Sequence, residues 1–193
     1  HDWYNDYLHG LNRQEEYLKK ITGLDDIFLP KDGCPLVSYD INETVHMLLI
    51  DTQWYLEDWD KSPKINDNCD NIKDREKFFI ELEGEIKKNQ HKTLVIAMHH
   101  PMFTNGVHGG KFALDKHLYP SQQKIPLPIL ASLVTQIRTQ GGVSKQDRFN
   151  EKYNELMKRL RVLAQTHNKT IFVSGHEHGL QYIEHDEVRQ VVS

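Results

Sequence analysis

Two stretches of the chain carry apolar residues at helical spacing, with charged residues between them. The first, 73–89, and the second, 151–166, each predict an amphipathic helix whose apolar stripe faces the core. The stripes are Phe78, Phe79, Leu82 and Ile86 in the first, and Tyr153, Leu156, Met157, Leu160 and Leu163 in the second. We also expect a short polar helix over 12–21 and a helix over 128–140.

Short runs of β-type residues predict the strands. Residues 36–41 and 45–51 read as a hairpin, because Asn42 and Glu43 interrupt two such runs. Residues 180–184 and 188–192 predict a final hairpin. Asp51, after the second run, suits a turn or a helix cap better than a distant ligand. We expect 55–71, rich in Asp, Asn and Lys, to be a surface loop.

Two further apolar runs end in histidines. The run from Thr93 leads into His99 and His100, and the run from Thr170 leads into His176 and His178. The alternation of strand and helix predicts an α/β fold, in which ligands gather outside the carboxyl ends of the strands. On an extended backbone His176 and His178 leave on the same side, and His100 points away from His99. Neutral imidazoles in such a place suit zinc, iron or manganese.

The motifs HHP (99–101) and GHEH (175–178) resemble those of the carboxyl-terminal half of calcineurin-like metallophosphoesterases, the superfamily that includes purple acid phosphatases. The leading His1 and Asp2 resemble the end of that family's GNH block, which an acidic residue follows. The family's DxH and GDxxD blocks have no counterpart in these residues. The resemblance implies a single domain portion over 1–193, a partial αββα sandwich of mixed β-sheets flanked by helices that lacks its amino-terminal strands.

What the resemblance implies for the site is a pair of divalent metal ions, iron, manganese or zinc, that act on a phosphate mono- or diester. His99 and His176 would bind one ion and His178 the other. His1 and Asp2 would be catalytic, with His1 facing the phosphate and Asp2 orienting it. His100 is expected to support or pack rather than bind metal. Three neutral histidines supply no negative charge, so we expect this piece alone to hold one metal weakly or none and to be inactive.

More residues separate HHP from GHEH in the sequence than a connection through one helix between two strands requires. The additional residues lie at about 103–148. Such an insertion is either a lid or substrate wall, or a surface excursion or oligomer contact. His108 and His117 within it are expected to be solvated loop histidines.

Composition narrows the classes of partner. The net charge of −4 and the absence of a basic cluster do not indicate nucleic acid. The apolar runs are far shorter than the roughly 18 residues of a membrane helix. The sequence does not indicate an oligomeric state. Two isolated cysteines, Cys34 and Cys69, neither establish nor exclude a disulfide. The segment GCP (33–35) and the insertion most resemble bacterial metallophosphoesterases, some joined to a surface or outer-membrane domain, which fits an exported or cell-envelope protein.

Two other functions remain open from the sequence. One is a metal-binding or partner-binding module without catalysis. The other is a mononuclear zinc hydrolase that uses the three histidines and a water.

Overall fold

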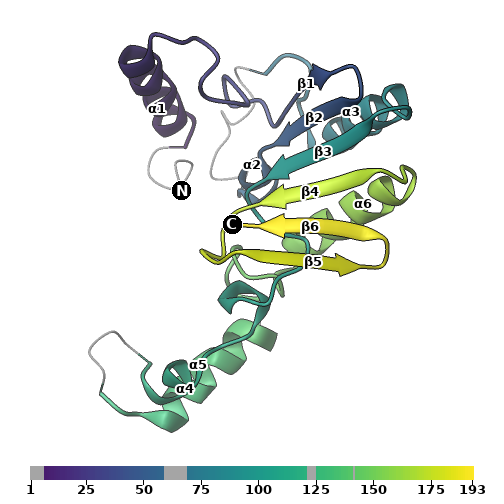
Figure 1. Cartoon of the computed structure of the whole chain (residues 1–193). Helices are drawn as coiled ribbons and strands as arrows, with labels where there is room; N and C mark the ends of the chain where they lie inside the picture. The colour runs from purple at the N-terminus through teal and green to yellow at the C-terminus, as the bar shows by residue number, and fades with distance from the viewer. Residues whose placement is uncertain (1–6, 59–68, 121–124, 141) are drawn as a thin grey trace.

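The computed structural model describes residues 7–58, 69–120, 125–140 and 142–193, and it is an α/β fold built on one mixed sheet (Figure 1). The helices are α1 (Tyr7–Thr22), α2 (Thr52–Leu56), α3 (Arg75–Lys88), α4 (Leu114–Leu118), α5 (Pro128–Gln140) and α6 (Glu151–Gln165). The strands are β1 (Leu36–Asn42), β2 (Val45–Ile50), β3 (Thr93–Met98), β4 (Thr170–Ser174), β5 (Gln181–His185) and β6 (Val188–Val192). The expected α/β class is confirmed.

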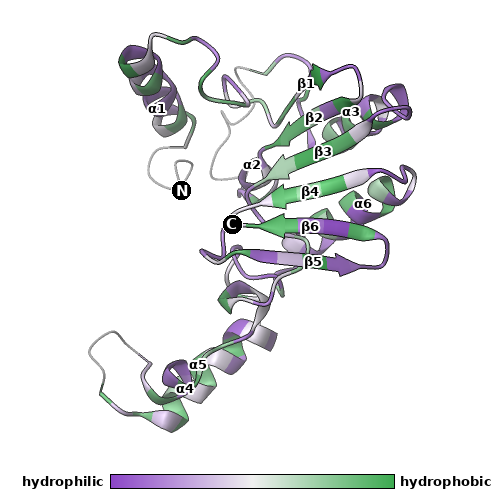
Figure 2. Ribbon diagram, viewed as in Figure 1, coloured by the Kyte–Doolittle hydropathy of each residue, from purple (hydrophilic) through white to green (hydrophobic). Residues whose placement is uncertain are grey.

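The sheet has the strand order β1-β2-β3-β4-β6-β5. Strands β2, β3, β4 and β6 are parallel, whereas the edge strands β1 and β5 pair antiparallel with their hairpin partners. Figure 2 shows that β2, β3 and β4 are mostly apolar, while β5 is mostly polar. This contrast is expected, because central parallel strands are usually buried and edge strands meet water.

Helices α3 and α6 cover the same face of the sheet and lie behind it in Figure 1. The connections β2–α3–β3 and β3–α6–β4 both step in one direction along the sheet. Because such crossovers are right-handed, successive steps in one direction place their helices on one face. The core forms there, between the helix stripes and the strand residues that alternate toward them; its fully buried members include Phe78, Leu82, Leu160, Leu48, Leu94, Ile96 and Phe172.

The opposite face of the sheet is also apolar but only half-buried. Strands β2 and β3 alternate between buried and half-buried positions, and on β4 Val173 is 37% exposed. Residues from α1 and from 28–30 reach this face near the carboxyl ends of the strands. The core of the described residues therefore lies mainly on the α3 and α6 side.

Most predicted elements are confirmed, with one correction. Both hairpins form, α3, α5 and α6 lie where the apolar stripes place them, and α1 extends the helix expected at 12–21. Asp51 is a helix cap, since its side chain accepts a hydrogen bond from the backbone N–H of Trp54. The surface loop expected from Tyr55 is wrong at its start: Tyr55 and Leu56 belong to α2 and are buried beside α3. Burial of these two apolar side chains favours the helix, although the residues that follow are polar.

A disulfide joins Cys34 and Cys69, 35 positions apart, with a Cα–Cα distance of 5.0 Å. Cys69 is buried in the core and Cys34 packs against it. The bridge therefore ties the segment before β1 to the segment before α3.

Helices α4 and α5 project away from the sheet (Figure 1). Their mutual contact buries Ala131 and Thr135 of α5, while larger apolar residues such as Ile129 remain exposed. Even so, among the described residues no helix combines the length and apolar character required to cross a membrane.

Candidate metal centre

The carboxyl ends of β2, β3 and β4 bring three segments to one edge of the sheet. In the parallel register Ile50 pairs with Met98, and Met98 pairs with Ser174. The residues that follow these strands, Asp51, His99 and Gly175, therefore emerge side by side. A 3.1 Å hydrogen bond from the N–H of Gly175 to the carbonyl of His99 continues the pairing one residue beyond β4. The backbone thus places the HHP and GHEH motifs against each other.

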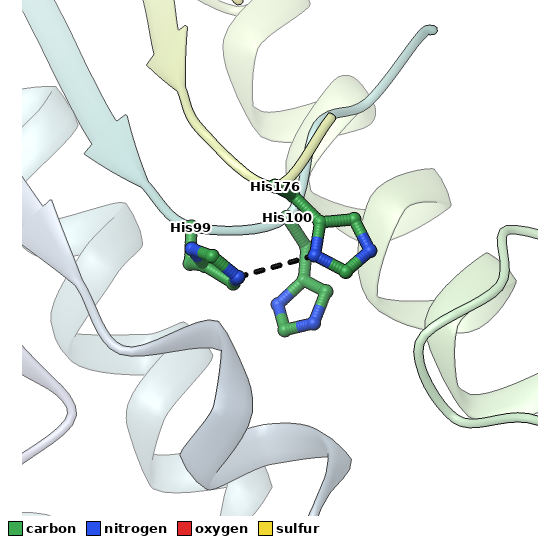
Figure 3. Close-up of side chains that lie close together, drawn as sticks. All are labelled: His99, His100 and His176. Carbon is green, nitrogen blue, oxygen red and sulfur yellow. Dashed lines mark hydrogen bonds between the residues drawn. The ribbon is translucent and has the colours of Figure 1, made fainter. Parts of the chain in front are cut away.

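Three histidine rings meet at this edge (Figure 3). The Nε2 of His99 lies 3.1 Å from the Nδ1 of His176. Including His100, one ring nitrogen from each of the three lies within 4.8 Å of the others. His100 and His176 are buried, and His99 is exposed. This spacing allows one metal ion to contact more than one imidazole.

The His176 ring is held in one tautomer. Its Nε2 lies 2.9 Å from the backbone carbonyl of Gln146, which accepts hydrogen bonds only, so Nε2 carries the proton. The Nδ1 that faces His99 is then an unprotonated lone pair. Metal-binding histidines commonly donate their other ring N–H to a carbonyl in this way. The chemistry of His176 therefore fits a metal ligand.

His100 fits a metal less well, because both its ring nitrogens are already bonded. Its Nδ1 lies 2.7 Å from the Oγ1 of Thr52, and its Nε2 lies 2.8 Å from the Oε1 of Gln146. Gln146 is itself oriented by a 2.8 Å bond from its Nε2 to the Oε1 of Gln53. Binding of an ion by His100 would break one of these buried bonds. The expectation that His100 points away from His99 is wrong, because their ring centroids lie 4.9 Å apart, and the supporting role of His100 stays a prediction.

The surroundings keep the histidines neutral. Desolvation lowers the pKa of His99 to about 4, helped by His176 nearby. Desolvation also lowers the pKa of His176, although its bond to the Gln146 carbonyl opposes the shift. Burial takes the pKa of His100 well below its ordinary value. Neutral imidazole is the form that binds metal, so protons compete weakly at neutral pH.

The expectation that His176 and His178 alternate on an extended backbone is wrong. Strand β4 ends at Ser174, and both histidines have left-handed backbones, with φ of 78° for His176 and 51° for His178. His178 is exposed and lies outside the three-ring group, although it lines the neighbouring pocket. Non-glycine residues with positive φ cost roughly 1–3 kcal/mol and are frequent at functional sites.

A pocket of about 720 Å³ opens beside His99 and His176, and the insertion forms its other wall. His108 lines it and stacks on His176, with ring centroids 4.0 Å apart. The Nδ1 of His108 donates to the Oδ1 of buried Asp147 at 2.8 Å, leaving its Nε2 for the pocket. Arg138 binds both oxygens of Asp147, at 2.9 and 2.6 Å. A charged network from the insertion thus fixes an imidazole over the metal centre.

The network changes what we expected of the insertion's histidines. His108 is not a solvated loop residue, whereas His117 lies on α4, contacts Thr135 and does not line the pocket. Sequence reasoning missed Gln146 and Asp147 entirely. The one signal was their place just before the helix that leads into the GHEH strand. His1 and Asp2, the expected catalytic pair, lie outside the described residues.

Desolvation raises the pKa of Asp147, but the bonds from His108 and Arg138 outweigh it and the pKa falls below its ordinary value. Those bonds raise the pKa of Arg138. The ion pair is therefore intact at neutral pH. It holds His108 in place without adding net charge.

Comparison with known proteins adds no assignment. No protein-family model matches the chain, and no curated protein matches it. Among solved structures it is similar to GAP50, described as the anchor in the inner membrane complex of Plasmodium, with 12% sequence identity and a TM-score of 0.41. That likeness covers 81% of this chain and 35% of the other, so the chain spans about a third of its length. A likeness this distant assigns neither family nor function.

Proposed function

We propose that this chain is the histidine-bearing part of a metal-dependent phosphoesterase of the calcineurin-like type, which hydrolyses phosphate mono- or diesters. The observation that carries the proposal is the pair His99 and His176 at adjacent strand ends, with ring nitrogens 3.1 Å apart and one tautomer fixed by a carbonyl. A divalent ion there would act as a Lewis acid and lower the pKa of a bound water to about 7.

The residues around the pair supply what a phosphate ester needs. The pocket holds Lys116, a cation that attracts an anionic substrate, while the charge of Arg138 is balanced by Asp147. His108, oriented by Asp147, presents its Nε2 to the pocket and, when both ring nitrogens carry a proton, is placed to donate to a phosphate oxygen. The apolar pocket residues Val107, Phe112 and Val134 come from the insertion. We therefore favour the substrate-wall interpretation of the insertion.

The two carboxylates near the centre differ in their bonding. Asp147 pairs with Arg138 and His108. Glu177 accepts a 3.4 Å hydrogen bond from the N–H of His108 through Oε2, while its buried Oε1 has no hydrogen-bond partner among the described residues. In the described residues, neither joins the three-histidine group. A site that holds two dications requires negative ligands. The proposal therefore places the bridging carboxylates in the parent protein outside this chain.

The disulfide supports a place in an oxidising compartment. Disulfides persist in exported proteins and are rare in the cytosol. The Cys34–Cys69 bridge lies at the core. We propose that the chain works in an exported or cell-envelope setting.

The test is hydrolysis by the parent protein. We expect the chain, expressed with its upstream coding sequence, to hydrolyse a chromogenic phosphodiester with added Mn²⁺. His99→Ala and His176→Ala should each lower the rate roughly a hundredfold or more. His117→Ala, outside the pocket, is the matched control. Full activity in His176→Ala, or none in the parent, contradicts the proposal.

A non-catalytic metal-binding module is the second candidate, and the neutral ligand set of the described residues favours it. The upstream coding sequence distinguishes these two candidate functions. DxH and GDxxD blocks about one strand apart support the phosphoesterase, and their absence supports the binder.

A further inference from the structure

Another pocket, of about 400 Å³, lies between α6 and the segment after HHP, with a lining that includes the apolar residues Met102, Met157 and Val162. It shares none of its lining residues with the pocket at the metal centre. One side is a polar stripe of α6 at helical spacing, made of Asn154, Lys158, Arg161 and Gln165. Phe103 and Arg148 form the other side. The metal centre explains none of these groups.

Arg148 is the unusual member. Its guanidinium lies over the Phe103 ring, 5.2 Å from the centroid. Its buried Nε has no hydrogen-bond partner, and no carboxylate among the described residues pairs with the guanidinium. Burial lowers the pKa of Arg148; Tyr153 opposes this shift, and the charge of Arg161 adds a smaller lowering. A charge removed from water without a partner is costly, so such a group requires an explanation.

The rest of the pocket carries an excess of positive charge. Lys158 and Arg161 line it with Arg148, and no acidic residue does. Asp186, which does not line the pocket, binds Arg161 at 2.6 Å. The whole chain has a net charge of −4, so three cations around one cavity are not a general property of its surface.

We propose that this pocket binds a small polyvalent oxyanion, such as a phosphate group, free or carried by an organic molecule. The oxyanion completes the hydrogen bonds of Arg148, and Lys158 and Arg161 add attraction from the rim. Asn154 and Gln165 offer amide donors, and the Phe103 ring offers a flat apolar surface for an attached group. The volume leaves room for more than one phosphate. This site is independent of the proposed phosphoesterase activity.

Binding of pyrophosphate to the 193-residue chain tests the proposal, by calorimetry in low-salt buffer freed of metal with a chelating resin. Removing metal takes away the ion that would hold phosphate at the histidine centre, and the Lys116→Met control tests the remaining cation of that pocket. We expect saturable binding that weakens with added salt. Arg148→Met should weaken it at least about tenfold, as expected for lost charged hydrogen bonds. Lys158→Met, at an exposed position, should weaken it about two- to fivefold.

Two controls separate this pocket from other basic sites. Lys169→Met removes an exposed lysine outside both pockets, and Lys116→Met removes the lysine of the pocket at the metal centre. Both should leave the affinity unchanged. Arg148→Lys should recover part of the binding lost in Arg148→Met. Since no carboxylate among the described residues pairs with the Arg148 guanidinium, we expect Arg148→Met to fold with little loss of thermal stability.

Absence of pyrophosphate binding overturns the proposal, as does binding that Arg148→Met and Lys158→Met leave intact. Equal weakening by Lys116→Met also overturns it, because the ligand would then be held by general positive charge or at the other pocket. If Arg148→Met fails to fold, the affinities of Lys158→Met and Lys169→Met for pyrophosphate are compared instead. Weaker binding by Lys158→Met alone supports the proposal, and equal affinities overturn it. A comparison of pyrophosphate with a phosphate monoester of similar charge then shows whether an organic group adds affinity.

Discussion

The Nδ1 of His176 lies 3.1 Å from the Nε2 of His99, although 77 positions separate the two residues in the chain. The parallel register of β3 and β4 causes this approach, since it aligns Met98 with Ser174. The carbonyl of Gln146 and the bonds of His100 then restrict the rings from the other side. The centre is therefore built by the sheet edge and closed by the insertion.

The hydroxyl of Thr52 is expected to stabilise the centre through His100. Thr52→Val keeps the shape but leaves the fully buried Nδ1 of His100 without its 2.7 Å partner. We expect a loss of about 1–3 kcal/mol in the free energy of unfolding, measured with urea. Thr166→Val, at an exposed position, should cost little. Equal losses in the two variants would contradict the proposed bond.

The two faces of the sheet should respond differently to the same truncation. Ile96 is 1% exposed and faces α3 and α6, whereas Ile171 is half-buried on the opposite face. Ile96→Val should lower the unfolding free energy by about 1 kcal/mol. Ile171→Val should lower it by less than about 0.5 kcal/mol. A larger cost at Ile171 would show that another layer covers the second face in solution.

The chain should lose stability in acid through Asp40. Hydrogen bonds from Lys92, and then from His46, lower the pKa of Asp40 from 3.8 to about 2. Because the folded pKa is depressed, the stabilisation is present above pH 3.8 and is lost as the pH falls through about 2. Asp40→Asn should therefore be less stable than the wild type at neutral pH and approach it near pH 2.

Urea midpoints across this pH range measure the difference, with Asp115→Asn on α4 as the control. A stability gap between Asp40→Asn and the wild type that does not change with pH would refute the assignment.

Reduction of the disulfide should destabilise the fold. The bridge closes 35 positions of chain, which corresponds to about 3–4 kcal/mol from restriction of the unfolded state. We expect a reductant to lower the unfolding free energy by about that amount. A double Cys34→Ser, Cys69→Ser variant should have the same unfolding free energy as the reduced protein, and a reductant should not change it. An unfolding curve that reductant leaves unchanged would exclude a stabilising bridge.

The sequence predicts the fold well where the signals are local. Apolar stripes placed α3 and α6, and Asn42 in the interrupted β-run placed the first hairpin. The approach of His99 and His176 followed from a general rule about the ends of parallel strands. Each of these inferences uses residues within one element or the next.

The rest of the site depends on contacts across long separations. Gln146 and Asp147 reach His176 and His108 across 30 and 39 positions, and no local pattern marks that return path. The side-by-side placement of His176 and His178 failed because β4 ends at Ser174, before both histidines, and each then has a left-handed backbone. Backbone conformation after a strand end is set by tertiary packing, which alternation does not report.

Metal binding by the 193-residue chain tests most directly the claim that His99 and His176 form a metal centre. Equilibrium dialysis against Mn²⁺ and Zn²⁺ at neutral pH, with metal counted per chain, should give at most one weakly held ion. His99→Ala and His176→Ala should each abolish that binding, and His117→Ala should retain it. Unchanged binding in His99→Ala and His176→Ala, or two tightly held ions per chain, would contradict the account.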